Sequence, residues 1–250
     1  MWKGARVAVV VPAFREEALI VPTLRAMPSF VDHILVVDDA SPDDTSRAVE
    51  AFASERVVLL RHEVNQGVGA ALATGYVHAL EQGADVIVVM AGDNQMDPAD
   101  LPLLLDAVVE GGADYVKGNR FVHAECTRMP LPRRVAGKGL AWLTRLAARV
   151  DIDDSQCGYT AISASAARHV PWAELWPRYG YPNDLLILLG RRGFRVTEVP
   201  VRPVYATEQS GVRPWHALTV AGVIARRWSL ERRRARATTN PAPARAPAES

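Results

Sequence analysis

The sequence predicts an α/β fold with a mostly parallel central sheet and helices on both faces. Two observations predict it. Short β-branched runs alternate with amphipathic stretches over the first 110 residues, a pattern typical of successive βα units. Polar residues also follow directly after each run. Parallel sheets bind their ligands at this position, the carboxyl ends of the strands.

The first half of the chain contains four such units, and the second half is less regular. Neither a linker nor an internal repeat interrupts residues 1–212, so we expect one domain there. Strands are expected at 7–11, 34–37, 57–60, 86–90, 115–117, 158–162 and 196–199, and helices at 16–27, 43–53, 68–82, 98–110, 135–150 and 184–192.

The composition is typical of a soluble globular protein: 250 residues, 49% hydrophobic, with 29 Lys and Arg against 28 Asp and Glu. A chain of this length buries enough surface to fold without a disulfide framework. We therefore expect Cys126 and Cys157 to be free thiols in a reducing cytoplasm. Neither a secretory leader nor an apolar segment of the ~20 residues that span a membrane is expected.

Basic charge is concentrated near the C-terminus. Residues 213–236 contain seven arginines and one glutamate, a local charge of +6, with apolar residues interleaved. This pattern predicts a basic amphipathic helix, either lying on the inner face of an anionic cell membrane or packed on the domain with a solvated outer face. Residues 237–250 have no apolar period and are expected to be disordered. We expect no nucleic-acid partner.

Acidic residues follow the second predicted strand. Asp38 and Asp39 stand where carboxylates could accept hydrogen bonds from a base or ribose, or help to hold a cation. The same segment also has the character of a turn, in which Asp43 or Asp44 caps the next helix. Both interpretations stay open from these residues alone.

A glycine-containing segment follows the third predicted strand. Gly67 and Gly69 lack the third glycine of a dinucleotide fingerprint, which argues against a dehydrogenase. Such glycines would let a helix N-terminus approach a phosphate or nucleobase, and a plain tight turn is the alternative.

Asp93 stands at the end of the fourth predicted strand, two residues before Gln95. Mg²⁺ takes one or two carboxylates and completes its coordination with water and substrate phosphate, so one well-placed aspartate can suffice. There the cation would neutralise a diphosphate leaving group. Asp97 is expected to cap the helix that Pro98 opens.

These motifs, in this order, resemble family 2 glycosyltransferases, and most closely the dolichyl-phosphate mannose synthase-like branch. The resemblance covers roughly residues 6–210. It implies a GT-A nucleotide-diphospho-sugar transferase fold, Mg²⁺ or Mn²⁺, and inverting transfer of a hexose from a UDP- or GDP-hexose to a polyprenyl phosphate of the cell envelope.

The resemblance also assigns roles to individual residues. Asp93 and Gln95 match the last two positions of the family's Asp-x-Asp-x-Gln metal site, whose first aspartate is Ala91 here. The residues matching the nucleotide pocket are Pro12, Phe14, Glu16, Asp38, Asp39, Gly67 and Gly69.

The expected acceptor-phosphate residues are Arg120, Arg133, Arg134 and Lys138. Arginine suits this role because its planar fork pairs bidentately with phosphate oxygens. Cys157, without a histidine near it in sequence, is interpreted as a packing residue.

An acceptor phosphate needs no general base, because it is largely dianionic at neutral pH. A soluble or protein-bound hydroxyl acceptor would need one, for which Asp184 is the candidate, although a helix cap is the alternative for that residue. A further alternative is a non-catalytic nucleotide-sugar-binding protein, which the alanine at position 91 suggests.

Overall fold

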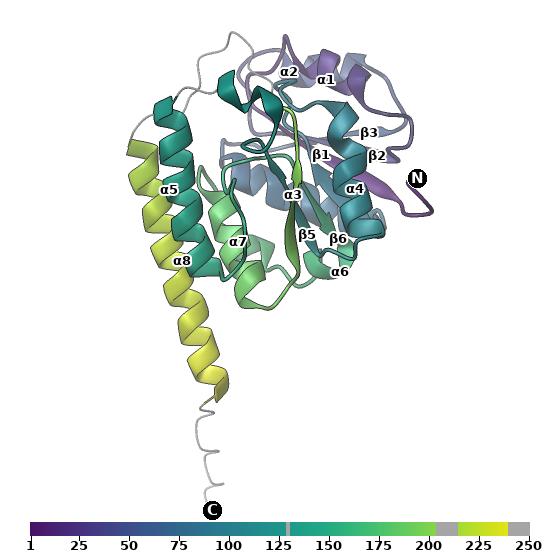
Figure 1. Ribbon diagram of the computed structural model, residues 1–250. Helices are drawn as coiled ribbons and strands as arrows, with labels where there is room; N and C mark the ends of the chain where they lie inside the picture. The colour runs from purple at the N-terminus through teal and green to yellow at the C-terminus, as the bar shows by residue number, and fades with distance from the viewer. Residues whose placement is uncertain (129–130, 204–214, 240–250) are drawn as a thin grey trace, which may run out of the picture.

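The computed structural model describes residues 1–128, 131–203 and 215–239. Its centre is a seven-stranded sheet with the strand order β3-β2-β1-β4-β6-β5-β7 (Figure 1). The strands are β1 (Val7–Ala13), β2 (His33–Asp38), β3 (Val57–Arg61), β4 (Val86–Val89), β5 (Tyr115–Asn119), β6 (Thr160–Ser163) and β7 (Val196–Pro200).

The helices connect these strands as the alternating pattern predicted. They are α1 (Ile20–Ala26), α2 (Thr45–Ala51), α3 (Val68–Glu81), α4 (Leu101–Val109), α5 (Leu131–Ala148), α6 (Ala164–Ala167), α7 (Tyr181–Arg191) and α8 (Trp215–Thr239), with short 3₁₀ turns η1 (Pro98–Asp100), η2 (Ala124–Arg128) and η3 (Trp172–Glu174).

The prediction of a mostly parallel sheet is confirmed. β1 pairs in parallel with both β2 and β4, and β5 pairs in parallel with β7. Only β6 runs antiparallel to its two neighbours, β4 and β5. The carboxyl ends of β1, β2, β4, β5 and β7 therefore meet at one edge of the sheet, where α/β proteins bind their ligands.

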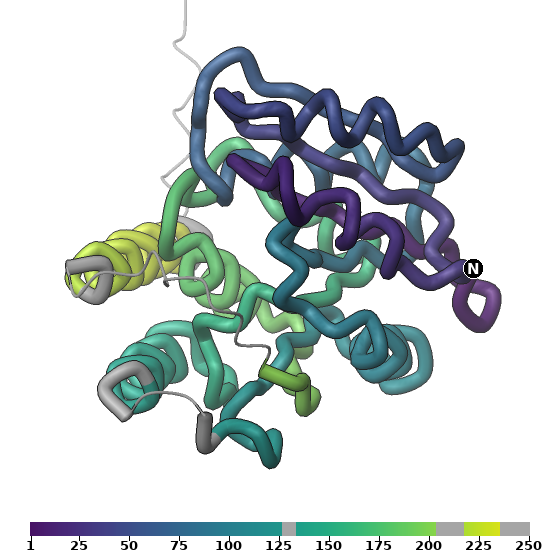
Figure 2. The backbone as a smooth tube through the Cα atoms, turned by 90° about the horizontal axis from the view of Figure 1, so that it is seen from above, coloured from purple at the N-terminus to yellow at the C-terminus, as the bar shows by residue number. Residues whose placement is uncertain are grey.

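Helices cover both faces of the sheet (Figures 1 and 2). On one face Leu24 of α1 and Leu104 of α4 join the inward side chains of β1 and β4. On the other, Leu72 of α3 and Leu186 of α7 pack on the opposite side chains of the same strands. Because both faces are buried, the strands are nearly continuous apolar runs.

The helices differ from the predicted ranges at several ends: α5 begins at Leu131 instead of residue 135, and α7 begins at Tyr181 instead of residue 184. The first helix begins at Ile20, and not at residue 16, because residues 16–19 form a turn in which the Glu16 carbonyl accepts from the backbone amides of Leu19 and Ile20. The fourth helix is preceded by η1, whose amide at Ala99 donates to the Asp97 side chain at 2.9 Å. The predicted Asp97 cap is therefore confirmed.

The helices α5 and α8 lie side by side and form a further layer outside α7 (Figures 1 and 2). Val220 and Ile224 of α8 pack against Ala147 and Ala148 of α5 and Ile187 of α7.

The predicted disordered tail, residues 237–250, overlaps α8 at residues 237–239, and the rest of it, residues 240–250, lies outside the described residues. Within the described ranges, no helix combines the length and mean hydropathy needed to cross a bilayer.

Candidate active site

A cavity of about 190 Å³ opens at the carboxyl ends of β4 and β5. Asp93 and Gln95 line it from the loop after β4, and Arg120 lines it from the residue after β5. The loop turns sharply at Asn94, whose φ is +55°, and the Gln95 amide donates to the Asp93 carboxylate at 3.1 Å. The structure thus brings three of the predicted site residues together, although β4 and β5 are not adjacent in the sheet.

Arg120 is held in place by a buried carboxylate. Its Nε and Nη2 donate to the two oxygens of Asp154 at 2.7 and 2.9 Å, and its backbone amide donates to Asp154 at 3.2 Å. Asp154 is almost inaccessible to solvent. Burial alone would raise the pKa of Asp154, but the neighbouring charges of Arg120 and Lys117 hold that pKa below its usual value. The pair therefore stays ionised and fixes the guanidinium at the cavity wall.

A second carboxylate, Glu198 of β7, supports the same loop. It accepts from the backbone amides of Asp153 and Asp154, both at 2.8 Å, and from the Asn119 side chain at 2.7 Å. Its burial raises its pKa. Glu198 thus connects β5, β7 and the loop that holds Arg120, and sequence reasoning missed it because it looks like an ordinary strand residue.

The residues after β1 also approach the cavity loop. The Gly92 amide donates to the Pro12 carbonyl at 3.3 Å, and a Cβ at Gly92 would lie 3.5 Å from Glu16 Cγ. Phe14, two residues after Pro12, is exposed to solvent. Pro12, Phe14 and Glu16 therefore lie at the same edge as Asp93, where a nucleotide could contact them, and that contact stays a prediction.

Asp38 is buried at the end of β2 and accepts from Ser46 Oγ and, at 2.9 Å, from the Ser41 amide. These bonds shape the turn before α2. Asp38 thus shows the turn-forming role that the sequence also allowed, and its contact with a nucleotide stays a prediction.

Asp39, Gly67 and Gly69 make contacts within the chain, and their contact with a nucleotide stays a prediction. Asp39 accepts from the Gln66 and Gly67 amides at 2.9 and 2.7 Å and pairs with His62 at 2.7 Å, so its carboxylate binds the chain's own loop. The N-terminus of α3 is covered by another segment, because the Ala70 amide donates to the Pro177 carbonyl at 3.1 Å.

The two glycines make that contact possible. A Cβ on Gly69 would lie 2.1 Å from the Trp176 carbonyl oxygen, and one on Gly67 would lie 2.6 Å from that of Pro177. In the structure the close approach of these glycines is to residues 176–178, and an approach to a phosphate or nucleobase stays a prediction.

Asp184, the predicted proton acceptor, lies in an enclosed ion pair. It is fully buried, and its two oxygens accept from Arg227 Nε and Nη2, both at 2.7 Å. The Trp176 amide donates to the same carboxylate at 2.9 Å. A carboxylate paired and enclosed in this way cannot reach a substrate hydroxyl, so its position fits an anchor for α8 and not the predicted proton acceptor.

Residues of the expected acceptor-phosphate site lie on the first turns of α5. Arg134 is half-buried and Lys138 is exposed, while the side chain of Arg133 lies outside the described residues. A Cβ at Gly137 would lie 3.0 Å from the ring of Phe121, which follows Arg120. The start of α5 is therefore next to the cavity, and phosphate binding by these residues stays a prediction.

Arg202 is a cavity residue that sequence reasoning missed. It follows β7 and lines the same cavity as Asp93, and its Nε donates to Glu125 at 3.1 Å. The signal was present, since a basic residue stands just after the last predicted strand. Cys157 also lines the cavity, and burial raises the pKa of its thiol, which agrees with a packing role.

The donors at the cavity suit a hard divalent cation better than a soft one. Asp93 offers a carboxylate and Gln95 an amide oxygen, which are the ligand types of Mg²⁺ and Mn²⁺. Among the described residues no three acidic, histidine or cysteine side chains form a metal cluster. The residues therefore fit a cation that takes its remaining ligands from substrate phosphate and water.

Residues 8–158 match the family described as Glycosyl transferase family 2. The chain is 30% identical to a UDP-N-acetylglucosamine–dolichyl-phosphate N-acetylglucosaminyltransferase of Methanococcus voltae, over 82% of this chain and 87% of the relative. It is 32% identical to an undecaprenyl-phosphate mannosyltransferase of Micrococcus luteus, over 78% of this chain and 82% of the relative.

Solved structures extend the likeness to the whole fold. A glucosyl-3-phosphoglycerate synthase from Mycobacterium tuberculosis superposes with a TM-score of 0.69 at 22% identity, covering 90% of this chain and 81% of that one. The expected GT-A architecture is therefore confirmed. The chain belongs to glycosyl transferase family 2 and is a glycosyltransferase.

Proposed function

We propose that this protein transfers a hexose from a nucleoside-diphosphate sugar to a polyprenyl phosphate, with inversion at the anomeric carbon. The observation that carries the proposal is the meeting of Asp93, Gln95 and Arg120 around one cavity. The relatives from Methanococcus voltae and Micrococcus luteus are named for transfer to dolichyl and undecaprenyl phosphate, which supports this acceptor class.

Asp93 and Gln95 are proposed to hold Mg²⁺ or Mn²⁺. Structures of the Mycobacterium tuberculosis neighbour contain UDP with Mn²⁺ or with Mg²⁺. A bound cation would supply positive charge for the departing nucleoside diphosphate. Pro12, Phe14 and Glu16 would contact the nucleotide, since they lie at the edge that carries Asp93.

The acceptor phosphate would attack without help from a base. One of its oxygens forms a bond to the anomeric carbon while the bond from that carbon to the nucleoside diphosphate breaks. Because the phosphate is already largely dianionic, no proton must be removed. Arg120, fixed by Asp154, would position one phosphate by charge, and preorganisation of this kind lowers the barrier directly.

A hydroxyl acceptor is the second candidate, because the structural neighbour is solved with phosphoglyceric acid. Such an acceptor must lose a proton. Asp184, the acid that the sequence offered for this step, is enclosed with Arg227. Its burial favours the phosphate acceptor over the hydroxyl one.

The protein is proposed to act at the cytoplasmic face of the membrane as a peripheral protein. Polyprenyl chains are lipid-soluble, while nucleoside-diphosphate sugars are water-soluble, so the cavity must face both phases. Its position at an exposed edge of the sheet suits that requirement.

The test is a transfer assay with radiolabelled UDP- and GDP-hexoses, Mg²⁺ or Mn²⁺, and a polyprenyl phosphate in detergent. We expect label in the organic phase, and Arg120→Ala should reduce that label by about 10²–10³-fold. The matched control is Arg168→Ala, an exposed arginine near the other edge of the sheet, which should transfer normally. Label appearing only in water-soluble product would reject the lipid acceptor, and donor binding without turnover would reject the enzyme.

A further inference from the structure

We propose that the outer face of α5 binds the surface of an anionic lipid bilayer and so brings the cavity to its acceptor. The inference deepens the proposed function and rests on it. It concerns four exposed apolar side chains, called here the α5 stripe: Val135, Trp142, Leu143 and Leu146.

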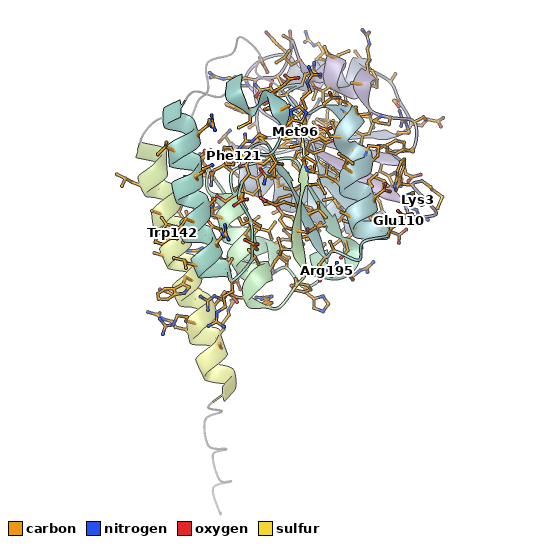
Figure 3. All side chains as sticks on the ribbon, viewed as in Figure 1. Lys3, Met96, Glu110, Phe121, Trp142 and Arg195 are labelled. Carbon is orange, nitrogen blue, oxygen red and sulfur yellow. The ribbon has the colours of Figure 1, made fainter. Side chains whose placement is uncertain are left out.

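The α5 stripe runs along one side of the helix. Val135, Trp142 and Leu146 are 64%, 60% and 59% exposed, and their spacings of seven and four residues place them on one face of a 3.6-residue period. The opposite face, with Ala141 and Thr144, is buried. Figure 3 shows Trp142 on the side of the molecule opposite Lys3. Packing of α5 on the domain therefore does not need these side chains.

Basic side chains flank the stripe. Lys138 and Arg145 are exposed and project beside it on the helical period, and Arg149, which is also exposed, follows the end of the helix. The sequence of α5 contains no acidic residue, although Arg145 pairs with Asp151 and Asp153 just beyond its end. An apolar strip beside cations is the pattern of a helix lying in the interface of an anionic membrane.

The neighbouring helix α8 adds charge and one exposed large apolar side chain, Leu218. Its exposed side chains include Arg226, Arg232 and Arg233, and its one acid, Glu231, is buried. Val220 and Ile224 of α8 are buried against α5 and α7 and so are not available to a membrane. We therefore assign the main membrane contact to α5, with α8, the basic C-terminal helix for which the sequence predicted it, as a cationic neighbour.

The stripe also leads to the cavity. Gly137, in the first turns of α5, lies against Phe121, which follows Arg120. Figure 3 shows Phe121 beside α5, and Arg120, the residue before it, lines the cavity. A bilayer seated on the stripe would thus hold phosphate headgroups near Arg120.

The test is flotation of the full chain with phosphatidylcholine vesicles that contain about a third phosphatidylglycerol. We expect the chain to float with these vesicles, and less with pure phosphatidylcholine. The double variant Trp142→Glu, Leu146→Glu should lower the partition coefficient at least about tenfold, because it removes apolar area and adds charge of the wrong sign. Equal flotation of wild type and variant would overturn the proposal.

The matched control is Leu103→Glu, which places the same charge on an exposed leucine of α4, on the far side of the sheet from α5 (Figure 1). It should float like wild type. Light scattering of the wild type distinguishes a different occupant: a dimer that the double variant dissociates, with no flotation, would assign the stripe to a second copy of the chain and reject the bilayer.

A second measurement does not depend on a destabilising variant. Both natural cysteines are buried, so a Leu146→Cys chain can be labelled there with an environment-sensitive dye. We expect a blue shift on adding anionic vesicles, and an unchanged spectrum would contradict the proposal.

Transfer in detergent separates this inference from the proposed function. The double variant should keep wild-type activity toward a polyprenyl phosphate in detergent and lose it toward the same lipid in vesicles. No transfer by wild type in either form would instead refute the proposed function, whatever the flotation result.

Discussion

Two regions at the same edge of the sheet look alike in sequence and differ in structure. The open region, with Asp93, Gln95 and Arg120, surrounds a cavity. The closed region, with Asp39, Gly67, Gly69 and Asp184, is filled by residues 176–178 and by Arg227. An acidic residue or a glycine after a strand thus indicates a close contact at this edge of the sheet. It does not tell whether the contact is with a ligand or with another segment of the chain.

The two regions should respond differently to substitution. Substitutions in the closed region should change the free energy of unfolding, and substitutions in the open region should change turnover. The four predictions that follow test this division, beginning with the largest expected effect.

Arg227→Met should cost the most stability. It would leave the Asp184 carboxylate buried without its guanidinium, and breaking a buried pair lowers the free energy of unfolding by about 3–5 kcal/mol. Guanidinium denaturation measures this loss. The matched control is Arg226→Met, an arginine 3.7 Å from Asp184 but substantially exposed, which should cost no more than about 1 kcal/mol. Similar losses in the two variants would contradict the assignment of Asp184 to anchoring.

Asp93→Asn should have the second largest effect, a loss of activity in the open region. Loss of the carboxylate that we propose binds the cation should reduce turnover by about 10²–10³-fold, with unfolding changed by no more than about 0.5 kcal/mol. Asp151→Asn, an exposed acid just beyond the end of α5, is the control and should keep its turnover. A normal rate in the Asp93 variant would remove that residue from the site.

Gly69→Ala should have an intermediate effect on stability. Its Cβ would overlap the Trp176 carbonyl, and overpacking of this kind costs about 1–3 kcal/mol. Gly139→Ala on α5, where nothing lies within 4 Å of a new Cβ, should instead stabilise by about 0.4–1 kcal/mol. If the Gly69 variant kept its stability but bound nucleotide sugar weakly, the glycine would belong to a ligand site after all.

The smallest expected effect is on the pH dependence of stability. The pKa of Asp154 is held below its usual value in the folded protein, so the unfolded chain binds that proton more readily. The stabilisation is therefore present above the usual aspartate pKa and is lost as the pH falls through the lowered one.

Asp154→Asn should flatten this acid limb by at most about 1.4 kcal/mol per pH unit, the slope that one proton supplies. Urea denaturation at a series of pH values measures the slope. Unchanged slopes would mean that Asp154 does not carry this dependence.

Local patterns predicted most of the sheet and its helices, because buried parallel strands are continuous apolar runs such as 7–11 and 34–37. Periodicity also located α3 and α4 within a few residues. The antiparallel direction of β6 was not predictable in this way, since direction depends on the path of the connection and not on the strand's own residues.

The site was predicted less completely for a related reason. Asp93 and Arg120 follow strands directly and could be found from that position. Arg227 is 43 residues from Asp184 in the sequence, and Glu198 is 44 residues from Asp154. The residues around each acid therefore give no indication of its partner. The same distance in sequence concealed the segment that covers Gly67 and Gly69.

The Arg227–Asp184 pair has a practical consequence for anyone who trims the gene. Cutting the chain at residue 212, where the predicted domain ends, would delete the arginine and leave the buried Asp184 side chain of α7 without its partner. A shorter version made for crystals or for assays should therefore retain residues through at least Arg234, which bonds Glu174 on the surface below. Arg227 and Arg234 of α8 thus stabilise the domain through their bonds to Asp184 and Glu174.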